Sequence, residues 1–599
     1  MDYGIVGNCL TSALVKKDAS VDWMCYPDFS SPSVFARLLD DKIGGSFRII
    51  PSQKCSIAQR YLENTAILQT IFSCKAYSFE VLDFFPRFRS IIQGKKKGLQ
   101  KLNSFIRIIK PLQGRPELKI IVEPKPDYAR KKTNIKKKGG LVIYSSGSQT
   151  ISVSSNASSF DWHALKIDEP VYFAIGNVSD SFTYWRAEKI LASTKRYWED
   201  WCKTLILPER NRETIVRSAI TLKLLTYDPT GAIIAAPTTS IPESYDNSGR
   251  NWDYRYCWVR DASFCVDALK KIGRSFESKK LINFLMNQTL KNDHIQIMYG
   301  IHGETRLTEQ ILSHLKGIEG QGPVRIGNAA YNQVQNDIYG ELLDIIYLYY
   351  GYYRYERRMT STHWRFIRYL VNQIKFHWER KDSGIWEARE NFAHYTHSKL
   401  MGYVGVDRAI KLAYIYKKDE LVNEWLPLRD EIKQDIFSRG YNKKAKAFTM
   451  TYNGLELDAA VLQMFYYRFT DIRDPRFVNT LRAIYRNLKT GELLQRYKSK
   501  DEFGKPRSAF LICTFWLIDA LYTIGEKKKA RQLYEKVMRH ANHLGLFSED
   551  IDIPTGKLSG NFPQAYTHIS IINTSILLSE WAKSRKMIQW NKMPSRKLL

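Results

Sequence analysis

Several common signals are missing from this chain. It contains no run of about 18 apolar residues that could span a membrane, and its N-terminus has no basic stretch followed by an apolar run, so no secretory signal is visible. The eight cysteines include no C-x-x-C pair, and no H-E-x-x-H, P-loop or G-x-S-x-G motif occurs. These absences argue against a membrane protein, a zinc peptidase, a P-loop NTPase and an α/β-hydrolase. They predict free, mostly buried thiols in a reducing cytoplasm.

Acidic residues are also few relative to basic ones. The chain has 91 Lys and Arg residues but only 61 Asp and Glu residues, which gives a net charge of +30. The densest basic runs, 94–98, 130–140 and 595–599, are short and scattered, which is typical of solvated loops. A nucleic-acid site would instead interleave basic and aromatic residues on one surface. We therefore favour a basic enzyme over a polyanion binder and expect no nucleic-acid partner; the sequence does not indicate an oligomeric state.

Apolar residues are abundant, at 44% hydrophobic and 13% aromatic over 599 residues. Because a single core stops growing near ~250–300 residues, more than one domain is expected. Up to about residue 180, short segments rich in β-branched and aromatic residues are separated by turn residues, which predicts an antiparallel β-sandwich. These segments are 65–88, 105–112, 118–125, 140–146, 150–155 and 171–179.

The pattern becomes helical after residue 183. Residues 183–205 fit a connecting helix, and from 209 onwards apolar residues recur with helical period, as at Ile367, Leu370 and Val371. Twelve helices are expected, near 211–226, 261–273, 276–291, 330–352, 361–379, 404–417, 420–438, 456–468, 474–487, 511–524, 526–542 and 565–583. No fixed-length repeat is present, which favours a closed ring of paired helices over an open solenoid. The predicted domains are a β-sandwich (1–182), a connecting helix (183–208) and a helical barrel (209–599).

Every second connection between these helices is long, which would place the long loops on one rim. They are 231–260, 292–329, 380–403, 488–510 and 543–564. The segment "NWDYRYCWVRDAS" carries Tyr254, Trp258, Arg260 and Asp261. Aromatic faces beside an Arg–Asp pair suit a sugar, which has apolar C–H faces and a polar rim. Alternatively, Asp261 caps the helix that follows, among core aromatics.

The segment 325–337 is crowded with amides. Arg325 is its one cation, and Asn328 and Gln333 are among the amides that offer donors and acceptors without net charge. This composition suits a neutral polyhydroxyl ligand. The alternative is that these amides only tie loops to the backbone.

Two further rim segments carry acidic residues. Glu387 follows Trp386 in "DSGIWEARE", where an indole can partly desolvate the carboxyl group. Glu549 lies in a turn-rich segment, where acidic residues also serve as turn formers. Two carboxyl groups from distant positions are what cleavage of a glycosidic bond requires. His394 and His397 are three residues apart without an evident third ligand, so we expect neither a metal nor a cofactor.

At these segments the chain resembles glycoside hydrolase family 15, the glucoamylase and trehalase-like family. The resemblance covers nearly the whole chain. It is carried, in family order, by "APTTSIPE", "NWDYRYCWVRDAS", "GPVRIGNAAYNQVQNDIYGELLD", "GIWEAR", "SKLMGYVGVDRA" and "GNFPQAYTH". The family implies an N-terminal antiparallel β-sandwich followed by an (α/α)6 barrel, and an inverting mechanism.

The resemblance also implies roles for individual residues. Glu387 matches the general acid and Glu549 the general base. The remaining candidates are substrate-binding residues: Tyr254, Trp258, Arg260, Asp261, Arg325, Asn328, Gln333, Trp386 and Asn561. Three positions depart from the family pattern: Asp550 stands where a second Glu is usual, Tyr403 where a Trp is common, and the Arg507 region lacks the usual acidic residue.

The resemblance implies an inverting, exo-acting α-glucoside hydrolase that releases terminal glucose. Glucoamylase-like action (glucan 1,4-alpha-glucosidase) on maltodextrin or glycogen ends is placed ahead of trehalase action on trehalose. A catalytically inactive glycan-binding protein is the alternative of another class, which the altered base motif keeps open. The expected ligand is an oligosaccharide or disaccharide.

Overall fold

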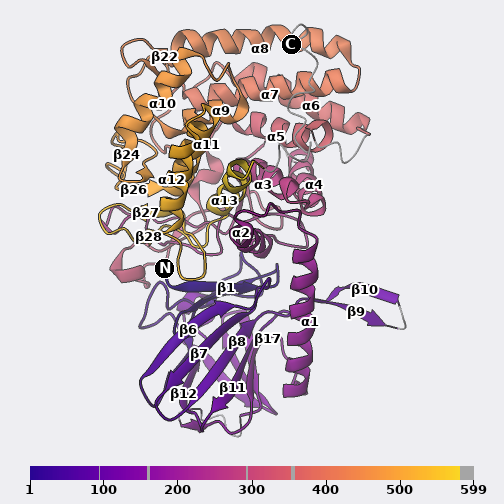
Figure 1. Ribbon diagram of the computed structural model, residues 1–599. Helices are drawn as coiled ribbons and strands as arrows, with labels where there is room; N and C mark the ends of the chain where they lie inside the picture. The colour runs from indigo at the N-terminus through magenta and orange to yellow at the C-terminus, as the bar shows by residue number, and fades with distance from the viewer. Residues whose placement is uncertain are drawn as a thin grey trace.

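The computed structural model describes residues 1–92, 95–100, 102–157, 162, 164–291, 295–352 and 358–580. An N-terminal β domain lies beneath a helical domain, and α1 (Tyr184–Lys203) runs along the side of the β domain (Figure 1). The basic run 595–599, part of the run 94–98, and the end of the helix expected at 565–583 lie outside the described residues. Within the described ranges, no helix has the length and apolar character that crossing a bilayer requires.

Two antiparallel sheets form the β domain. The first has the strand order β1-β2-β3-β5-β12-β16, with β4 beside β3, and the second has the order β13-β14-β15-β17-β11-β8-β7-β6. The strands of the first sheet are β1 (Tyr3–Gly7), β2 (Ser12–Lys16), β3 (Val21–Cys25), β4 (Ser33–Phe35), β5 (Ser46–Pro51), β12 (Glu117–Glu123) and β16 (Leu165–Lys166). Those of the second are β6 (Cys55–Tyr61), β7 (Leu68–Cys74), β8 (Ser78–Phe84), β11 (Ser104–Gln113), β13 (Asn134–Lys138), β14 (Leu141–Ser146), β15 (Gln149–Ser155) and β17 (Val171–Gly176). A separate hairpin pairs β9 (Phe88–Ile92) with β10 (Lys95–Gln100).

The core of this domain lies between the two sheets. In β14 every second residue is buried, as the two-residue period of a strand requires when one face packs inward. Phe47 of β5 packs against Phe105 of β11 and Phe173 of β17, with ring centroids 6.3 and 5.3 Å apart. These contacts join one sheet to the other, and they confirm the predicted sandwich.

The helical domain is the predicted (α/α)6 barrel. Within the described residues, twelve helices correspond to the twelve expected segments. They are α2 (Arg212–Leu224), α3 (Val259–Lys271), α4 (Ser275–Lys291), α5 (Ile338–Ile346), α6 (Ser361–His377), α7 (Thr396–Ile415), α8 (Asp419–Asp435), α9 (Gln463–Tyr467), α10 (Pro475–Leu488), α11 (Leu511–Thr523), α12 (Lys527–Met538) and α13 (Ala565–Leu578). The inner ring runs through α3, α5, α7, α9, α11 and α13: α13 contacts α3, α3 contacts α5, α5 contacts α7, and α11 contacts both α9 and α13.

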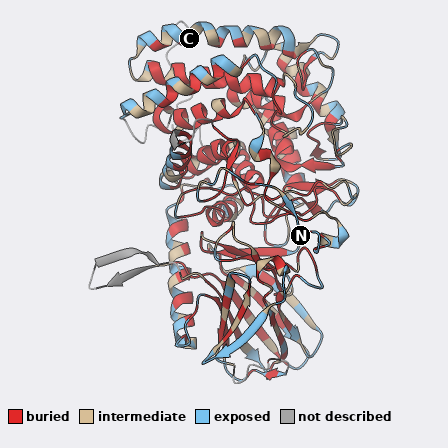
Figure 2. Cartoon of the chain, turned by 180° about the vertical axis from the view of Figure 1, so that it is seen from behind, coloured by how far each residue is buried: buried red, intermediate tan, exposed pale blue. Residues whose placement is uncertain are grey.

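The burial of each helix follows from its sequence. The inner helix α11 is apolar nearly all round and buried along most of its length. The outer helix α12 is amphipathic and buries one face through Ala530, Leu533, Tyr534 and Val537. Figure 2 shows the same distinction, with buried residues gathered inside the ring and exposed ones on the outer helices.

Several helix starts differ from the prediction; α9, expected to begin at 456, begins at Gln463 because residues Ala459–Leu462 form the 3-10 helix η6. α5 begins at Ile338 instead of 330, because residues Ala329–Asn332 form the 3-10 helix η3 instead. α7 begins at Thr396 instead of 404, so His397, which we expected in a loop, is buried in its first turn. α3 begins at Val259 directly after Trp258, so Asp261 lies inside the first turn and does not cap the helix.

Long and short connections alternate around the ring. The long ones are 225–258, 292–337, 378–395, 436–458, 489–510 and 539–564. Each of the five expected rim loops corresponds to one of these connections, although residues 396–403 of the expected loop 380–403 belong to α7. The connection 436–458 was not predicted to be one of them, because its short strands β22 (Tyr441–Asn442) and β23 (Ala447–Phe448) lie between segments of helical period.

The expectation that all thiols are free is wrong for one pair. Cys55 of β6 and Cys74 of β7 are direct cross-strand partners and form a disulfide. The other six cysteines are buried and form no disulfide, as expected. Disulfides are more common outside reducing compartments. This bridge therefore weakens the argument from free cysteines for a cytoplasmic location, which stays a prediction.

Candidate active site

One pocket brings together residues from several rim loops. Its empty volume is about 490 Å³. The lining residues are Ala235, Tyr254, Trp258, Arg260, Asp261, Ile385, Trp386, Glu387, Arg496, Phe510, Glu549, Gln564 and Tyr566. Seven of the sequence-predicted site residues are among them, including both carboxyl groups. The two glutamates are separated by 162 positions in the sequence and meet only because α6–α7 and α12–α13 present their long connections on the same rim.

Glu387 lies in the α6–α7 connection with a backbone φ of 59°, which is strained for a residue that is not glycine. Its Oε1 accepts a hydrogen bond from Nε1 of Trp258 at 2.7 Å and lies 3.4 Å from a guanidinium nitrogen of Arg260. Arg260 also donates to the carbonyl oxygen of Ile385 at 2.8 Å. The start of α3 therefore holds both the backbone and the carboxyl group of this loop.

The indole that reaches the Glu387 carboxyl group is thus that of Trp258. We expected Trp386, its sequence neighbour, to be the desolvating ring. Nε1 of Trp386 instead donates to Oδ1 of Asp458 at 2.8 Å, and its ring packs against Phe510 and Trp516. Trp386 still lines the pocket, where its ring forms part of the apolar surface.

Glu549 directly precedes β27 (Asp550–Asp552), which pairs with β26 (Ser508–Phe510) and β28 (Leu558–Ser559). Its backbone N–H donates to the carbonyl of Asn561 at 3.1 Å, and its carbonyl accepts from the N–H of Leu511 at 3.0 Å. Oε1 accepts a hydrogen bond from the Tyr254 hydroxyl. The buried Oε2 has no hydrogen-bond partner among the described residues, which leaves it available to a ligand or a water molecule.

The electrostatic surroundings of Glu549 are unusual. Burial, followed by the negative charges of Asp550 and Glu243, raises the pKa of Glu549 well above its usual range. The hydrogen bond from Tyr254 and the charge of Arg496 act in the opposite direction. Arg496 pairs with Glu243 at 2.8 Å. The contacts that favour the ionised form of Glu549 are therefore those with Tyr254 and Arg496.

The N-terminus of α3 contributes the remaining predicted pocket residues. The rings of Tyr254 and Trp258 meet edge to face, with centroids 5.4 Å apart. Nε of Arg260 lies 3.5 Å from Oδ1 of Asp261, and burial raises the pKa of Asp261 to about 6 against the charge of Arg260. Aromatic surface and a charged pair thus meet at one pocket, as the segment predicted.

Four predicted substrate-binding residues are not among those that line the pocket: Arg325, Asn328, Gln333 and Asn561. Arg325 pairs with Glu309 at 3.2 Å. Asn328 caps η3 and donates to the carbonyl of Asp253 at 3.3 Å. Asn561 donates to the carbonyl of Trp252 at 2.8 Å. Their side chains bond to the protein, and a direct contact with a ligand stays a prediction.

Gln333 and its neighbours bind the loop that carries Glu387. Nε2 of Gln333 donates to the carbonyl oxygen of Glu387 at 3.0 Å. The N–H of Asn336 donates to Oδ2 of Asp382 at 2.8 Å, and the N–H of Ser383 donates to the carbonyl of Val334 at 2.9 Å. The amide-rich segment therefore supports the Glu387 loop along its length.

Sequence reasoning missed several pocket residues. Arg496, Phe510, Gln564 and Tyr566 line the pocket without having been singled out. Gln564 and Tyr566 lie inside the quoted "GNFPQAYTH" segment, which was the available signal. Arg496 stands in "QRYK", where no local pattern distinguishes it from a surface cation.

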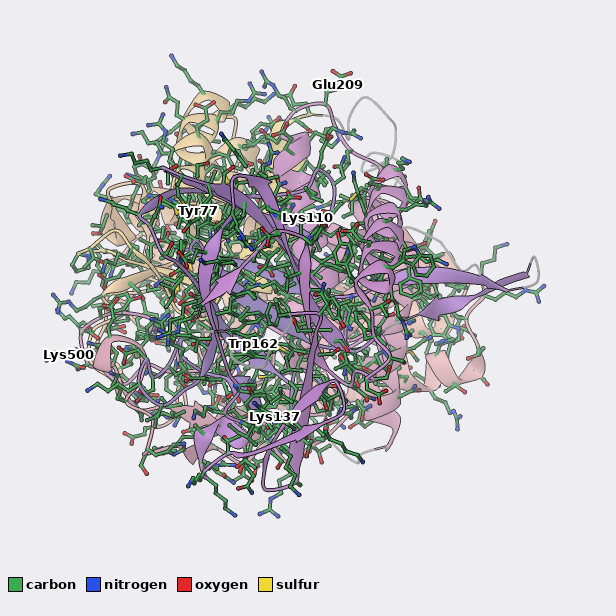
Figure 3. The ribbon with its side chains drawn as sticks, turned by 90° about the horizontal axis from the view of Figure 1, so that it is seen from below. Tyr77, Lys110, Lys137, Trp162, Glu209 and Lys500 are labelled. Atoms are coloured by element: carbon green, nitrogen blue, oxygen red, sulfur yellow. A yellow bond between two sulfur atoms is a disulfide. The ribbon has the colours of Figure 1, made fainter. Side chains whose placement is uncertain are left out.

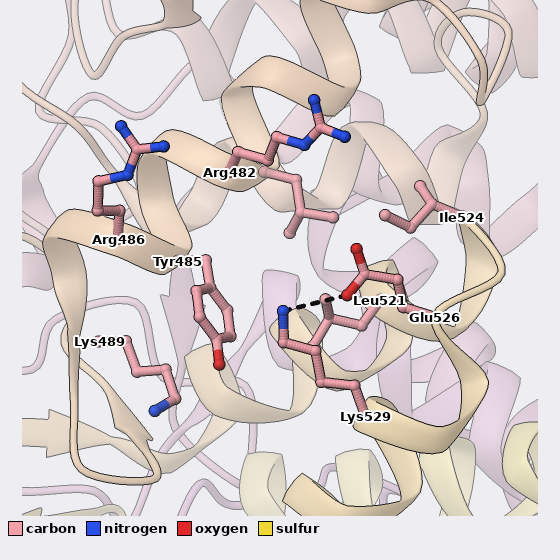
Figure 4. Close-up of a pocket in the computed structure, with 9 residues that line it drawn as sticks. Arg482, Tyr485, Arg486, Lys489, Leu521, Ile524, Glu526 and Lys529 are labelled. Atoms are coloured by element: carbon pink, nitrogen blue, oxygen red, sulfur yellow. Dashed lines mark hydrogen bonds and ion pairs between the residues drawn. The ribbon is translucent and has the colours of Figure 1, made fainter.

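A different pocket lies on the outer side of the helical domain, between α10 and the α11–α12 turn (Figure 4). Its floor is apolar, and Glu526, the one carboxylate in its lining, pairs with Lys529 at 3.1 Å. It offers no facing carboxyl groups and therefore no means of glycosidic cleavage.

Comparison with known proteins shows the family of the chain. The profile of glycosyl hydrolases family 15 matches residues 209–576, and that of the trehalase-like N-terminal domain matches residues 3–170. A trehalase from Mycolicibacterium smegmatis is 33% identical over 96% of this chain and 90% of its own length. A trehalase from Thermoplasma volcanium is 31% identical over 96% of this chain and 93% of its own.

Among solved structures, a bacterial glucoamylase complexed with acarbose is similar at a TM-score of 0.68 and 14% identity, covering 98% of this chain and 94% of that one. Identity this low shows the fold alone. The barrel, the family match and the pocket lined by two glutamate carboxyl groups define the class of the protein as a glycoside hydrolase. Because the matched profile covers more than half of the sequence, the chain belongs to glycosyl hydrolases family 15.

Proposed function

We propose that this protein hydrolyses trehalose to two glucose molecules with inversion at the attacked anomeric carbon. Relatives that are 31% and 33% identical over nearly the whole chain are named trehalase, and a trehalase-like N-terminal domain precedes the barrel. The glucoamylase-like reading, placed first from the sequence, draws on a likeness that extends only to the fold. Trehalose therefore takes precedence over maltodextrin.

The observation that carries the proposal is that Glu387 and Glu549 line one pocket from two separate rim loops. Glu387, protonated, is the general acid, and Glu549, ionised, is the general base. An inverting pair needs a gap of ~6.5–9.5 Å, which admits one water molecule. The free Oε2 of Glu549 is the atom that would accept the proton from this water.

The reaction balances without a cofactor. Glu387 gives its proton to the glycosidic oxygen as the bond from that oxygen to the attacked anomeric carbon breaks. A water molecule attacks this carbon from the opposite face and loses a proton to Glu549. Trp258 and Arg260, which contact Oε1 of Glu387, orient the acid, and Tyr254 orients the base. Exchange of one proton with solvent then restores both carboxyl groups.

A substrate panel tests the specificity. Glucose release is measured from trehalose, maltose and maltotriose at equal concentrations. We expect kcat/KM for trehalose to exceed that for maltotriose by roughly 100-fold or more, because a site whose polar groups match one leaving sugar leaves them unpaired with another. Faster release from maltotriose would favour the glucoamylase-like reading. Absence of turnover on every α-glucoside would favour the inactive glycan-binding alternative.

A further inference from the structure

A second concave surface lies on the rim, next to the catalytic pocket. The α10–α11 connection supplies most of its lining, and segments of the α2–α3 and α12–α13 connections complete it. The α10–α11 connection faces both sites: Arg496 lines the catalytic pocket, while its neighbour Gln495 lines this groove. The groove is open to solvent, with about 1370 Å³ of empty space.

Four cations gather on one turn of this groove. Residues Asp501 and Gly504 close the turn with reciprocal backbone hydrogen bonds of 3.0 and 3.1 Å. Lys500 and Lys505 flank it directly, and Lys498 and Arg507 follow on the two arms. All four line the groove. Figure 3 shows Lys500 at the edge of the molecule, where a ligand can reach it.

The acidic residues of the same turn do not neutralise these cations. Asp501 pairs with Arg250 at 2.5 Å and accepts a hydrogen bond from the Tyr497 hydroxyl at 2.6 Å. Glu502 accepts a hydrogen bond from the N–H of Arg389 at 2.7 Å. Both acidic side chains therefore bond to groups outside the set of four cations.

The four cations have no ion pair within the described part of the chain. Other basic residues of the rim are paired, as Arg250 is with Asp501, Arg325 with Glu309 and Arg496 with Glu243. Like charges carried opposite one another on two arms of a turn destabilise it. A multiply charged anion bound between the four cations would relieve this repulsion, and the relief would favour its binding.

The turn is held in place before any ligand arrives. Nε2 of Gln495 donates to the carbonyl of Pro506 at 3.1 Å, which joins the two arms, and the N–H of Ile553 contacts the carbonyl of Arg507 at 3.4 Å. Within the described residues, the buried Ser248 hydroxyl that lines the groove has no hydrogen-bond partner. The groove thus combines four clustered cations with one carboxylate in its lining, that of Asp246.

We propose that this groove binds a phosphorylated sugar. The ammonium groups and the guanidinium group would bind the phosphate oxygens, for which an arginine fork and point-charge lysines are both suited. The Asp246 carboxylate, on the α2–α3 side of the groove, would accept hydrogen bonds from sugar hydroxyls. This inference does not depend on which glycoside the catalytic pocket cleaves.

Isothermal titration calorimetry tests the proposal with glucose 6-phosphate, glucose, inorganic phosphate and tripolyphosphate as separate probes. The test variant is K500Q/K505Q. The matched control is K443Q/K444Q, which removes two exposed lysines from the 436–458 connection of the same rim. Thermal melting checks that both variants fold, so the result does not rely on enzymatic activity.

We expect glucose 6-phosphate to bind the wild type more tightly than inorganic phosphate does. Its affinity should fall as the salt concentration rises, because salt screens the charges. Its Kd should rise about tenfold or more in K500Q/K505Q, since two charge-assisted contacts are lost, and stay unchanged in K443Q/K444Q. Absence of binding to the wild type, or equal loss in both variants, would overturn the site. If inorganic phosphate binds as tightly, or only tripolyphosphate binds, the assignment of a sugar phosphate is overturned.

Discussion

The hydroxyl group of Tyr254 donates a hydrogen bond to Oε1 of Glu549, although the two residues are 295 positions apart. Tyr254 lies between α2 and α3, and Glu549 lies between α12 and α13, so the contact closes the ring at the point where its first and last helices meet. A donor at this position stabilises the ionised carboxylate, which is the form a general base needs. The proposed roles make this contact a determinant of the pH at which the enzyme works.

Removing this donor should shift the pH profile. In Y254F the pKa of Glu549, already raised by burial and by its acidic neighbours, should rise further because the anion loses a hydrogen bond. A base that titrates at higher pH is protonated over more of the acidic range, so the acidic limb of kcat/KM against pH should move to higher pH. We expect a loss of roughly 10-fold or more at neutral pH, with partial recovery at alkaline pH.

Tyr497 provides the control for this experiment. Its hydroxyl bonds to Asp501 on the same rim, and Tyr497 does not line the catalytic pocket. Y497F should leave the acidic limb where it is in the wild type. An unmoved limb in Y254F would contradict the role given to the Tyr254 contact.

Neutralising Asp550 should have the opposite effect. After burial, the charge of Asp550 is the largest cause that raises the pKa of Glu549. In D550N this repulsion is absent, so Glu549 should ionise at lower pH and the acidic limb should move to lower pH. The measurement is kcat/KM across the pH range, beside wild type. A shift in the same direction as in Y254F would be inconsistent with the electrostatic account.

Loss of either catalytic carboxyl group should stop turnover while leaving binding intact. E387Q and E549Q each keep the size and polarity of the side chain, and each should lower kcat by ~10²–10⁴-fold, with trehalose binding still detectable by calorimetry. E390Q is the matched control, since Glu390 is an exposed residue of the same connection as Glu387. If E549Q kept near wild-type turnover, another group would have to be the base.

Gln333 should act on catalysis through the position of Glu387. Q333M keeps the length of the side chain but removes the donor to the Glu387 carbonyl. Because Glu387 holds a strained backbone conformation, loss of this support should lower kcat by roughly 10-fold with little change in KM. Q310M, at an exposed glutamine in the same 292–337 connection, should behave as wild type. A change in KM alone would indicate direct contact with the substrate instead.

The fold was largely predictable because its signals are local. Helical period marks all twelve barrel helices, and strand period marks the sandwich, since burial of one face imposes the pattern on consecutive residues. The connection 436–458 was missed because its short strands, β22 and β23, lie between segments of helical period. The Cys55–Cys74 bridge was also missed, because it depends on the register of two neighbouring strands, which spacing alone does not give.

The site was predictable only in part, because its contacts join residues that are far apart in the sequence. Glu387, Glu549 and the 254–261 segment reach one pocket as expected. The partner of each group could not be predicted: Trp258 reaches Glu387 across 129 positions, and Gln333 reaches the backbone of Glu387 across 54. Amide composition suggested a polar ligand, which stays a prediction, and the partners of Gln333 and Asn336 in the loop that carries Glu387 were not foreseen.

The most direct test of the central claim, that Glu387 and Glu549 act on opposite faces of a glucosyl unit with one water molecule between them, is the anomeric form of the product. Proton NMR would follow trehalose hydrolysis in the first minutes, before the released glucose mutarotates. Inversion converts the attacked unit to β-glucose while the leaving unit stays α, so the two anomers should appear in equal amounts. Initial release of α-glucose alone would mean retention and would contradict the account.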